Sequence, residues 1–250
     1  MTPPTSAFSA FALEPFPTLR PGDDLVAAIM RVLEQSAGAL QDQDIVVVAS
    51  KALSVVENRY VNLSTVTPSP EAESLYARTG KPAALTQLIL DESVSYFVAG
   101  ERGPVIARHR LGFELTSAGV DRAGTDGAWL LPVDPDSSAR ALRDALITLA
   151  GVDVGVVIAD SDGRADRRGA TCISIGSAGV APLRITEHDG KQQEETLTDM
   201  ITGAAGFILG QRGRGAPVVV LRGISYDSSD DGVAVVLHHA RHPRTGRQGE

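Results

Sequence analysis

The sequence contains a single cysteine, Cys172, so it cannot form an internal disulfide, and the reducing cytoplasm is its default compartment. Cys172 lies in an apolar run over residues 171–175, which predicts a small core residue rather than a nucleophile. No apolar run approaches the roughly 20 residues that a membrane-spanning helix needs. No basic segment followed by an apolar core marks the N-terminus as a signal peptide. These absences predict a cytoplasmic protein without a membrane partner.

Positive charge is also scarce, because the formal net charge of the 250-residue chain is −8. A nucleic-acid surface needs a basic patch, so nucleic acid is not an expected partner. Anions would have to be bound locally, by arginines or by metal ions. Hydrophobic residues make up 43% and charged residues 22% of the chain, which is ordinary for a globular domain. We expect a flexible N-terminus over residues 1–14, one domain over 15–237 and a flexible tail over 238–250.

The hydrophobic pattern predicts an α+β fold with mixed or antiparallel sheets and flanking helices. Helices are expected after an N-cap at Asp23, over 70–90 with a break near 79–82, from a cap at 136–138 to residue 149, and over 197–209. Strands are expected at 45–49, 94–99, 105–108, 113–117, 128–131, 154–159, 171–175 and 217–221. The glycines at 176–179 predict a turn, and the polar residues at 187–195 and 211–215 predict loops. No internal repeat and no Gly-Lys-Ser/Thr phosphate loop is present.

Polar side chains follow three of the predicted strands. The apolar run 154–159 ends at Asp160 and Ser161, which can hold a hard cation through oxygen ligands, and Arg164, Arg167 and Arg168 follow it. An ordinary polar turn explains the same residues, and this stretch alone favours that interpretation. Ser50 and Lys51 follow the strand at 45–49, and Asp121 follows 118–120. Lys51 is suited to neutralise a phosphate, although a surface lysine after a strand is common.

The order and spacing of short motifs over residues 17–223 resemble the coenzyme F420-0:L-glutamate ligase family, which adds glutamate to a deazaflavin precursor. The motifs include Arg-Pro-Gly-Asp-Asp-Leu at 20–25, Val-Ala-Ser-Lys at 48–51, Ala-Gly-Val-Asp at 118–121, Leu-Pro-Val-Asp-Pro-Asp at 131–136 and Asp-Ser-x-Gly-Arg at 160–164. Each motif is weakly specific alone. Together they identify the chain as a member of this family.

The resemblance implies a homodimeric, GTP-dependent amide ligase in which the γ-phosphate activates a substrate carboxylate as an acyl phosphate. The substrates would be GTP, L-glutamate and the deazaflavin precursor, with Mg²⁺ or Mn²⁺ and a place for K⁺. The implied roles fall on these residues: catalysis on Lys51 and Arg164; nucleotide or substrate binding on Ser50, Lys51, Ser161, Arg164 and Arg168; metal binding on Asp121, Asp160 and Ser161.

Several positions depart from the family pattern. They are Gly124 in place of a metal-shell Asn, Asp162 and Asp166 in place of aromatic residues, Ala165 in place of Pro, Ala170 in place of Gln, and Met200 in place of Glu. Asp162 and Asp166 are equally well explained as substitute oxygen ligands or as solvated turn residues. The hypotheses are therefore the family's ligase, a paralogue that joins another carboxylate and amine, and a nucleotide- or metabolite-binding homologue without turnover.

Overall fold

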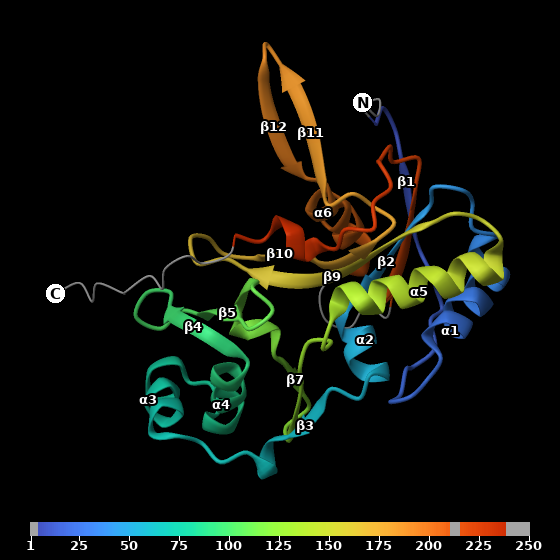
Figure 1. The fold of residues 1–250 in the computed structure, drawn as a ribbon. Coiled ribbons are helices and arrows are strands. Elements are labelled where there is room, and N and C mark those ends of the chain that lie inside the picture. The colour runs from blue at the N-terminus through green and yellow to red at the C-terminus, as the bar shows by residue number, and fades with distance from the viewer. Residues whose placement is uncertain (1–4, 211–215, 239–250) are drawn as a thin grey trace.

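The computed structural model describes residues 5–210 and 216–238, which fold around a five-stranded central sheet (Figure 1). The strand order is β1 (Ser9–Ala12), β13 (Val218–Arg222), β2 (Ile45–Ala49), β9 (Gly155–Gly163) and β10 (Ala170–Ala178). Only β2 and β9 pair in parallel; the other neighbours are antiparallel. The α+β prediction is therefore confirmed.

Both faces of this sheet are buried because alternate side chains point to opposite helical layers. Val46 and Val48 pack with α1 (Leu25–Val32), which continues into η1 (Leu33–Ala37), and with α5 (Pro135–Ala150). Ile45 and Val47 pack instead with α6 (Leu197–Leu209) on the other face. This explains why the strand sequences read as continuous apolar runs rather than as alternating ones.

A smaller lobe with its own apolar core lies beside one end of the sheet (Figure 1). It contains α3 (Pro70–Thr79) and α4 (Ala83–Asp91), and the three-stranded sheet β4 (Ser93–Val98), β5 (Val105–His109) and β6 (Glu114–Thr116). A second three-stranded sheet joins the lobe to the body, in the order β3 (Tyr60–Asn62), β8 (Gly127–Trp129) and β7 (Asp121–Ala123). Short helical segments complete the connections: α2 (Ser50–Val56), η2 (Leu63–Thr65), η3 (Ser117–Gly119) and η4 (Val233–Val236).

A two-stranded hairpin projects from the body above α6 (Figure 1). It comprises β11 (Leu183–His188) and β12 (Lys191–Thr196), so the prediction of a loop at 187–195 is wrong. Both strands are mostly polar, so the hydrophobic pattern of the sequence did not predict them. The turn residues Asp189 and Gly190 carry the positive φ angles, 51° and 71°, that a tight hairpin turn requires.

Three further predictions are corrected at element ends. The prediction of a glycine-rich turn at 176–179 is wrong for residues 176–178, because β10 continues to Ala178 with a bulge between Ser174 and Gly176. The N-cap of α1 is Asp24, which accepts from Ala27 N at 3.0 Å, and not Asp23, which accepts from Arg20 N at 2.7 Å. The N-cap of α5 is Asp134 rather than a residue of 136–138.

The structure describes parts of the two terminal segments that were expected to be flexible. Residues 9–12 lie inside the segment expected to be flexible, yet they form β1 in register with β13. The loop at 211–215 and residues 239–250 of the tail lie outside the described residues. The backbone oxygen of His238 accepts a 2.7 Å hydrogen bond from Arg108. None of the helices in the described ranges is long and apolar enough to cross a membrane.

Candidate active site

The candidate site forms where β2 ends beside β9. Ala49 and Ala159 are partners in the β2–β9 register, so Ser50, the first residue after β2, lies beside Asp160, which continues in β9. Ser50 opens α2, is buried, and donates from Oγ to Asp160 Oδ1 at 2.6 Å. The parallel pairing therefore brings together two residues that are 110 positions apart in the chain.

The carboxyl group of Asp160 is enclosed by protein although the residue keeps a minor part of its surface exposed. The pKa of Asp160 is raised from 3.8 to about 7, chiefly because burial removes the water that stabilises the charged form. The negative charges of Asp121 and Asp162 contribute to this increase, while the bond from Ser50 Oγ and the backbone N–H of Ser161 oppose it. A cation bound here would remove this penalty, so the site favours positive charge.

Asp121 supplies the second carboxylate, and Lys51 already lies against it. Lys51 Nζ is 3.6 Å from Asp121 Oδ2, and both side chains are about half exposed, at 49% and 50%. An ion pair this exposed contributes at most about 1 kcal/mol, so Lys51 can leave Asp121 for another anion at small cost. Asp121 follows η3, in which Ser117 and Ala118 hold φ values of 56° and 51°. Such strained backbone is common beside functional groups and here aims the start of β7 toward the end of β9.

The side chain of Ser161 points to the opposite face of β9 from that of Asp160, because neighbouring residues of a strand face opposite ways. Ile158 packs on the α1/α5 side and Ala159 on the α6 side, so Asp160 continues the first face and Ser161 the second. Its cross-strand partner Cys172 also faces α6, where a Cβ at Gly206 would lie 2.8 Å from Cys172 Sγ. The hydroxyl beside Asp160 is that of Ser50.

Asp162 and Asp166 have different surroundings. Asp162 Oδ1 accepts from Thr116 N at 2.9 Å, which fastens β9 to β6, and burial raises the pKa of Asp162. Asp166 is exposed and lies between two guanidinium groups, 3.5 Å from Arg164 Nε and 3.1 Å from Arg167 Nε. The hydrogen bond from Arg167 is the main reason that the pKa of Asp166 is lowered.

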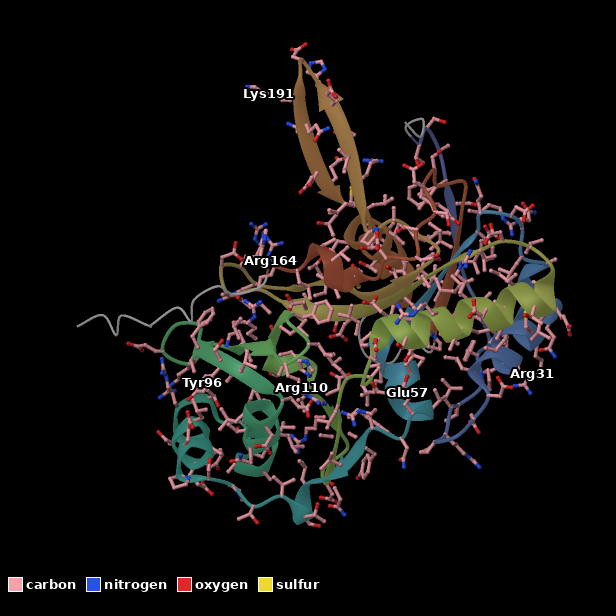
Figure 2. The ribbon with its side chains drawn as sticks, viewed as in Figure 1. Arg31, Glu57, Tyr96, Arg110, Arg164 and Lys191 are labelled. Carbon is pink, nitrogen blue, oxygen red and sulfur yellow. The ribbon has the colours of Figure 1, made fainter. Side chains whose placement is uncertain are left out.

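Arg164 lies at the tip of the β9–β10 hairpin, above the smaller lobe (Figure 2), and Arg167 and Arg168 follow it in the same connection between β9 and β10. There they line a hollow of about 510 Å³ together with Ala99, Pro104 and Thr116 from the lobe. The structure thus separates the predicted residues into two groups. Ser50, Lys51, Asp121 and Asp160 gather at the strand ends, whereas Arg164 and Arg168 line the hollow, and reasoning from the sequence overlooked Thr116.

Two of the departures from the family pattern, Met200 and Gly124, have surroundings that the structure defines. Asp199 is tied to β10, since its carboxylate accepts from Ser174 N and Ser174 Oγ at 2.8 Å each, and Met200 is 43% exposed on α6. Gly124 has a φ of 64° in the β7–β8 turn, and a Cβ there would meet no heavy atom within 4 Å. Asparagine adopts this left-handed conformation more often than most other residues do, but less readily than glycine.

The donor set fits a magnesium-like ion that is shared with a phosphate. Within the described ranges no group of three or more His, Cys, Asp or Glu side chains is placed to hold a metal by itself. Mg²⁺ is usually bound by one or two carboxylates, with substrate phosphates and water completing the shell. Asp160 and Asp121 provide that number, and the raised pKa of Asp160 marks a carboxylate that lacks a full positive partner.

The parallel strand pair within a mixed sheet, with carboxylates and a lysine gathered at one edge, defines an α+β protein with a candidate cation site. The family model described as F420-0:Gamma-glutamyl ligase matches residues 15–223, so the chain belongs to this family. It is 34% identical over 240 residues to the coenzyme F420:L-glutamate ligase of Methanothermobacter thermautotrophicus, covering 92% of this chain and 95% of that protein. Proteins of the same name from Methanosarcina acetivorans and Methanopyrus kandleri are each 36% identical, over 88% and 85% of this chain and 87% and 86% of their own lengths. The family resemblance seen in the sequence is therefore confirmed.

Proposed function

We propose that this protein is a GTP- and divalent-metal-dependent ligase that joins L-glutamate to the coenzyme F420-0 precursor through an amide bond. The family match and the names of the relatives support the ligation itself. The observation that carries the metal and nucleotide part is the arrangement of Ser50, Asp160, Asp121 and Lys51 at one sheet edge.

The proposed reaction has two balanced steps. A carboxylate oxygen of the acceptor attacks the γ-phosphorus of GTP, and the bond to the β,γ-bridging oxygen breaks, which releases GDP and leaves an acyl phosphate. The glutamate amine then attacks the acyl carbon, phosphate departs with the electron pair of the C–O bond, and the amine proton passes to solvent. Both steps concentrate negative charge on phosphate oxygens, which positive groups must neutralise.

The chain's own residues would divide this work. Asp160 and Asp121 would hold Mg²⁺ or Mn²⁺, with Ser50 fixing the orientation of the Asp160 carboxylate. A bound divalent ion supplies charge neutralisation and orientation of the phosphates. Lys51 would release Asp121 and pair with a phosphate oxygen, a change that its exposure and its 3.6 Å separation make inexpensive. Arg164 would bind a negatively charged group of a substrate at the β9–β10 tip.

Thermal unfolding tests the nucleotide and metal part. GTP with Mg²⁺ or Mn²⁺ is expected to raise the Tm of the parent protein, and Asp160→Ala to abolish that rise. Asp144→Asn, which removes an exposed carboxylate from α5, is the matched control and should keep the rise. No rise in the parent with any nucleotide would refute this part of the proposal.

Product analysis tests the ligation. The protein, the deazaflavin precursor, L-glutamate, GTP and Mn²⁺ are mixed, and mass spectrometry is used to seek a product heavier by one or more glutamyl units. An alternative acceptor is favoured by one observation: the substituted residue Asp166 lies among the arginines of the β9–β10 tip, and the substituted residue Asp162 fastens that tip to β6. Nucleotide binding without this product would support that alternative.

We also propose that the protein is a homodimer, formed through the face that carries β11, β12 and α6. Exposed apolar side chains gather there, among them Phe8 at 51%, Ile185 at 55% and Met200 at 43%. A groove of about 600 Å³ runs beside them. A lone two-stranded hairpin is marginally stable in water, so a second copy is the occupant that suits β11 and β12. Light scattering should give the mass of a dimer for the parent and of a monomer for Ile185→Asp.

A further inference from the structure

The hollow at the β9–β10 tip has the composition of an anion site. Three guanidinium groups, those of Arg164, Arg167 and Arg168, line about 510 Å³, while Asp166 is the only carboxylate among the lining residues that the structure describes. Guanidinium groups bind carboxylates and phosphates through paired N–H donors, which gives both strength and geometry. The lining of the hollow therefore carries more positive than negative groups, which favours the binding of an anion that is not part of the chain.

Hydrogen bonds from Thr116 fix the end of β9, so the segment that carries the three arginines begins from a well-anchored strand. Thr116 N donates to Asp162 Oδ1 at 2.9 Å, and Thr116 Oγ1 donates to Gly163 O at 2.7 Å. These two bonds fix the last residues of β9 against β6 immediately before Arg164. The hollow therefore lies between two elements that are fastened to each other, the β9–β10 tip and the smaller lobe.

Asp166 occupies the position that an external oxyanion would take. Its two carboxylate oxygens approach Arg164 and Arg167, one each, at 3.5 Å and 3.1 Å. The side chains are exposed, at 62% for Asp166, 40% for Arg164 and 65% for Arg167. Ion pairs this exposed contribute little because water and salt screen them, so a ligand with more oxygen atoms can displace Asp166 easily.

The hollow is separate from the metal site. Gly163 stands three residues after Asp160, which is about 10 Å along an extended strand. One elongated substrate can therefore place its reacting carboxylate at the strand ends and a second anionic group among the arginines. Glutamate is too short to span that distance when its amine is at the reacting carbon, so the acceptor is the substrate that fits.

We propose that Arg164, Arg167 and Arg168 form a subsite for an oxyanion of the acceptor, phosphate or carboxylate, and that Asp166 holds this subsite in the absence of substrate. The inference rests on the proposed function for the identity of the acceptor. It adds a division of labour: the nucleotide binds at the strand ends, and the acceptor is recognised at the hairpin tip.

Arginine labelling with phenylglyoxal tests the subsite without turnover. Peptide mass mapping reports the labelling of each arginine in the presence of F420-0, of GTP with Mg²⁺, or of L-glutamate. F420-0 should protect the tip arginines, while Arg31, exposed on α1 at the far end of the molecule in Figure 2, should be labelled equally throughout. Protection by GTP with Mg²⁺ alone, or by none of these compounds, would overturn the proposal.

Two simpler probes identify the anion and separate this inference from the proposed function. Inorganic phosphate protects the tip if a phosphate group is the ligand, and γ-glutamylglutamate protects it if glutamyl carboxylates are. Protection by either probe without formation of a ligated product would keep the subsite and remove the proposed reaction. A ligated product without any protection of the tip arginines would support the proposed reaction and overturn the subsite.

Substitutions give the quantitative readout. Arg167→Gln should raise the KM for the acceptor about tenfold and leave the KM for GTP unchanged, because one charge-assisted pair is lost at the subsite only. Asp166→Asn should lower the acceptor KM by up to about fivefold, since the internal competitor is removed. A weaker acceptor interaction in Asp166→Asn would show that this carboxylate binds substrate instead of replacing it.

Discussion

Replacing Asp160 by asparagine should stabilise the protein without divalent ions, and the gain should grow with pH. The carboxyl group sits where burial and two neighbouring carboxylates oppose its ionisation, and these effects raise its pKa to about 7. Asparagine keeps the oxygen that accepts from Ser50 Oγ and has no charge to bury. The expected stabilisation is therefore the removal of an electrostatic penalty.

The size follows from the pKa values. The folded protein holds the Asp160 proton up to about pH 7, whereas the unfolded chain releases it near pH 3.8. Because the folded pKa is the higher one, the folded state binds more protons between these values, and stability is lost as the pH rises through that window. Each pH unit costs about 1.4 kcal/mol, so the advantage of asparagine should grow by about 3 kcal/mol between pH 5 and pH 8. For a chain of this length that corresponds to roughly 6–12 °C in Tm.

Thermal unfolding in EDTA at pH 5, 6, 7 and 8 measures this difference for the parent and Asp160→Asn. Asp144→Asn removes an exposed carboxylate of α5 and should track the parent at every pH. A gain that is the same at pH 5 and pH 8 would refute the reasoning, as would a variant that is less stable than the parent at pH 8. Either result would mean that Asp160 is already ionised and well solvated in the folded protein.

The remaining predictions concern other contacts. Arg222→Gln removes two bonds to the buried Asp44 carboxylate and should cost about 3 kcal/mol in urea unfolding, with Asp44→Asn added to it restoring part of the loss. If the double variant is no better, the buried charge is not the cause. Ser177→Ala removes a buried hydroxyl that has no partner in the described structure, so its Tm should stay level or rise, whereas Ser174→Ala breaks side-chain hydrogen bonds and should lower it by a few degrees. Equal effects of these two serine changes would contradict the hydrogen-bond argument. Lys51→Gln should raise the KM for GTP about tenfold in the ligation assay with Tm nearly unchanged, and a normal KM would exclude a phosphate contact.

The apolar strands of the main sheet were predictable because their composition reports burial directly. Ile45 to Ala49 and Val218 to Leu221 are unbroken apolar runs, and both are strands with helices on each face. The β11–β12 hairpin was not predictable in this way. Its residues are mostly polar, and its signal was the Asp189–Gly190 turn alone.

The candidate site was predictable in its members but not in its grouping. Ser50, Asp160 and Asp121 were singled out because polar residues at strand ends are chemically conspicuous. Which strands run side by side is a long-range property, so the 2.6 Å contact between Ser50 and Asp160 could not be read from the sequence. The separation of Ser161 from Asp160 could have been read from it, because strand alternation alone places them on opposite faces.

The short strand β1 bears on how the chain tolerates shortening at its N-terminus. β1 pairs with β13, and Arg222 at the end of β13 lies 5.4 Å above the Phe11 ring, which holds the four-residue strand in place. A chain that began at Leu13 would present β13 as an open edge. Its run Val218–Leu221 is β-branched and apolar, the kind of sequence that pairs with another chain when its backbone donors are free. Such a shortened protein is expected to form its helices and apolar cores and yet to aggregate. Pairing with β1 therefore protects the edge of β13 from pairing with another chain.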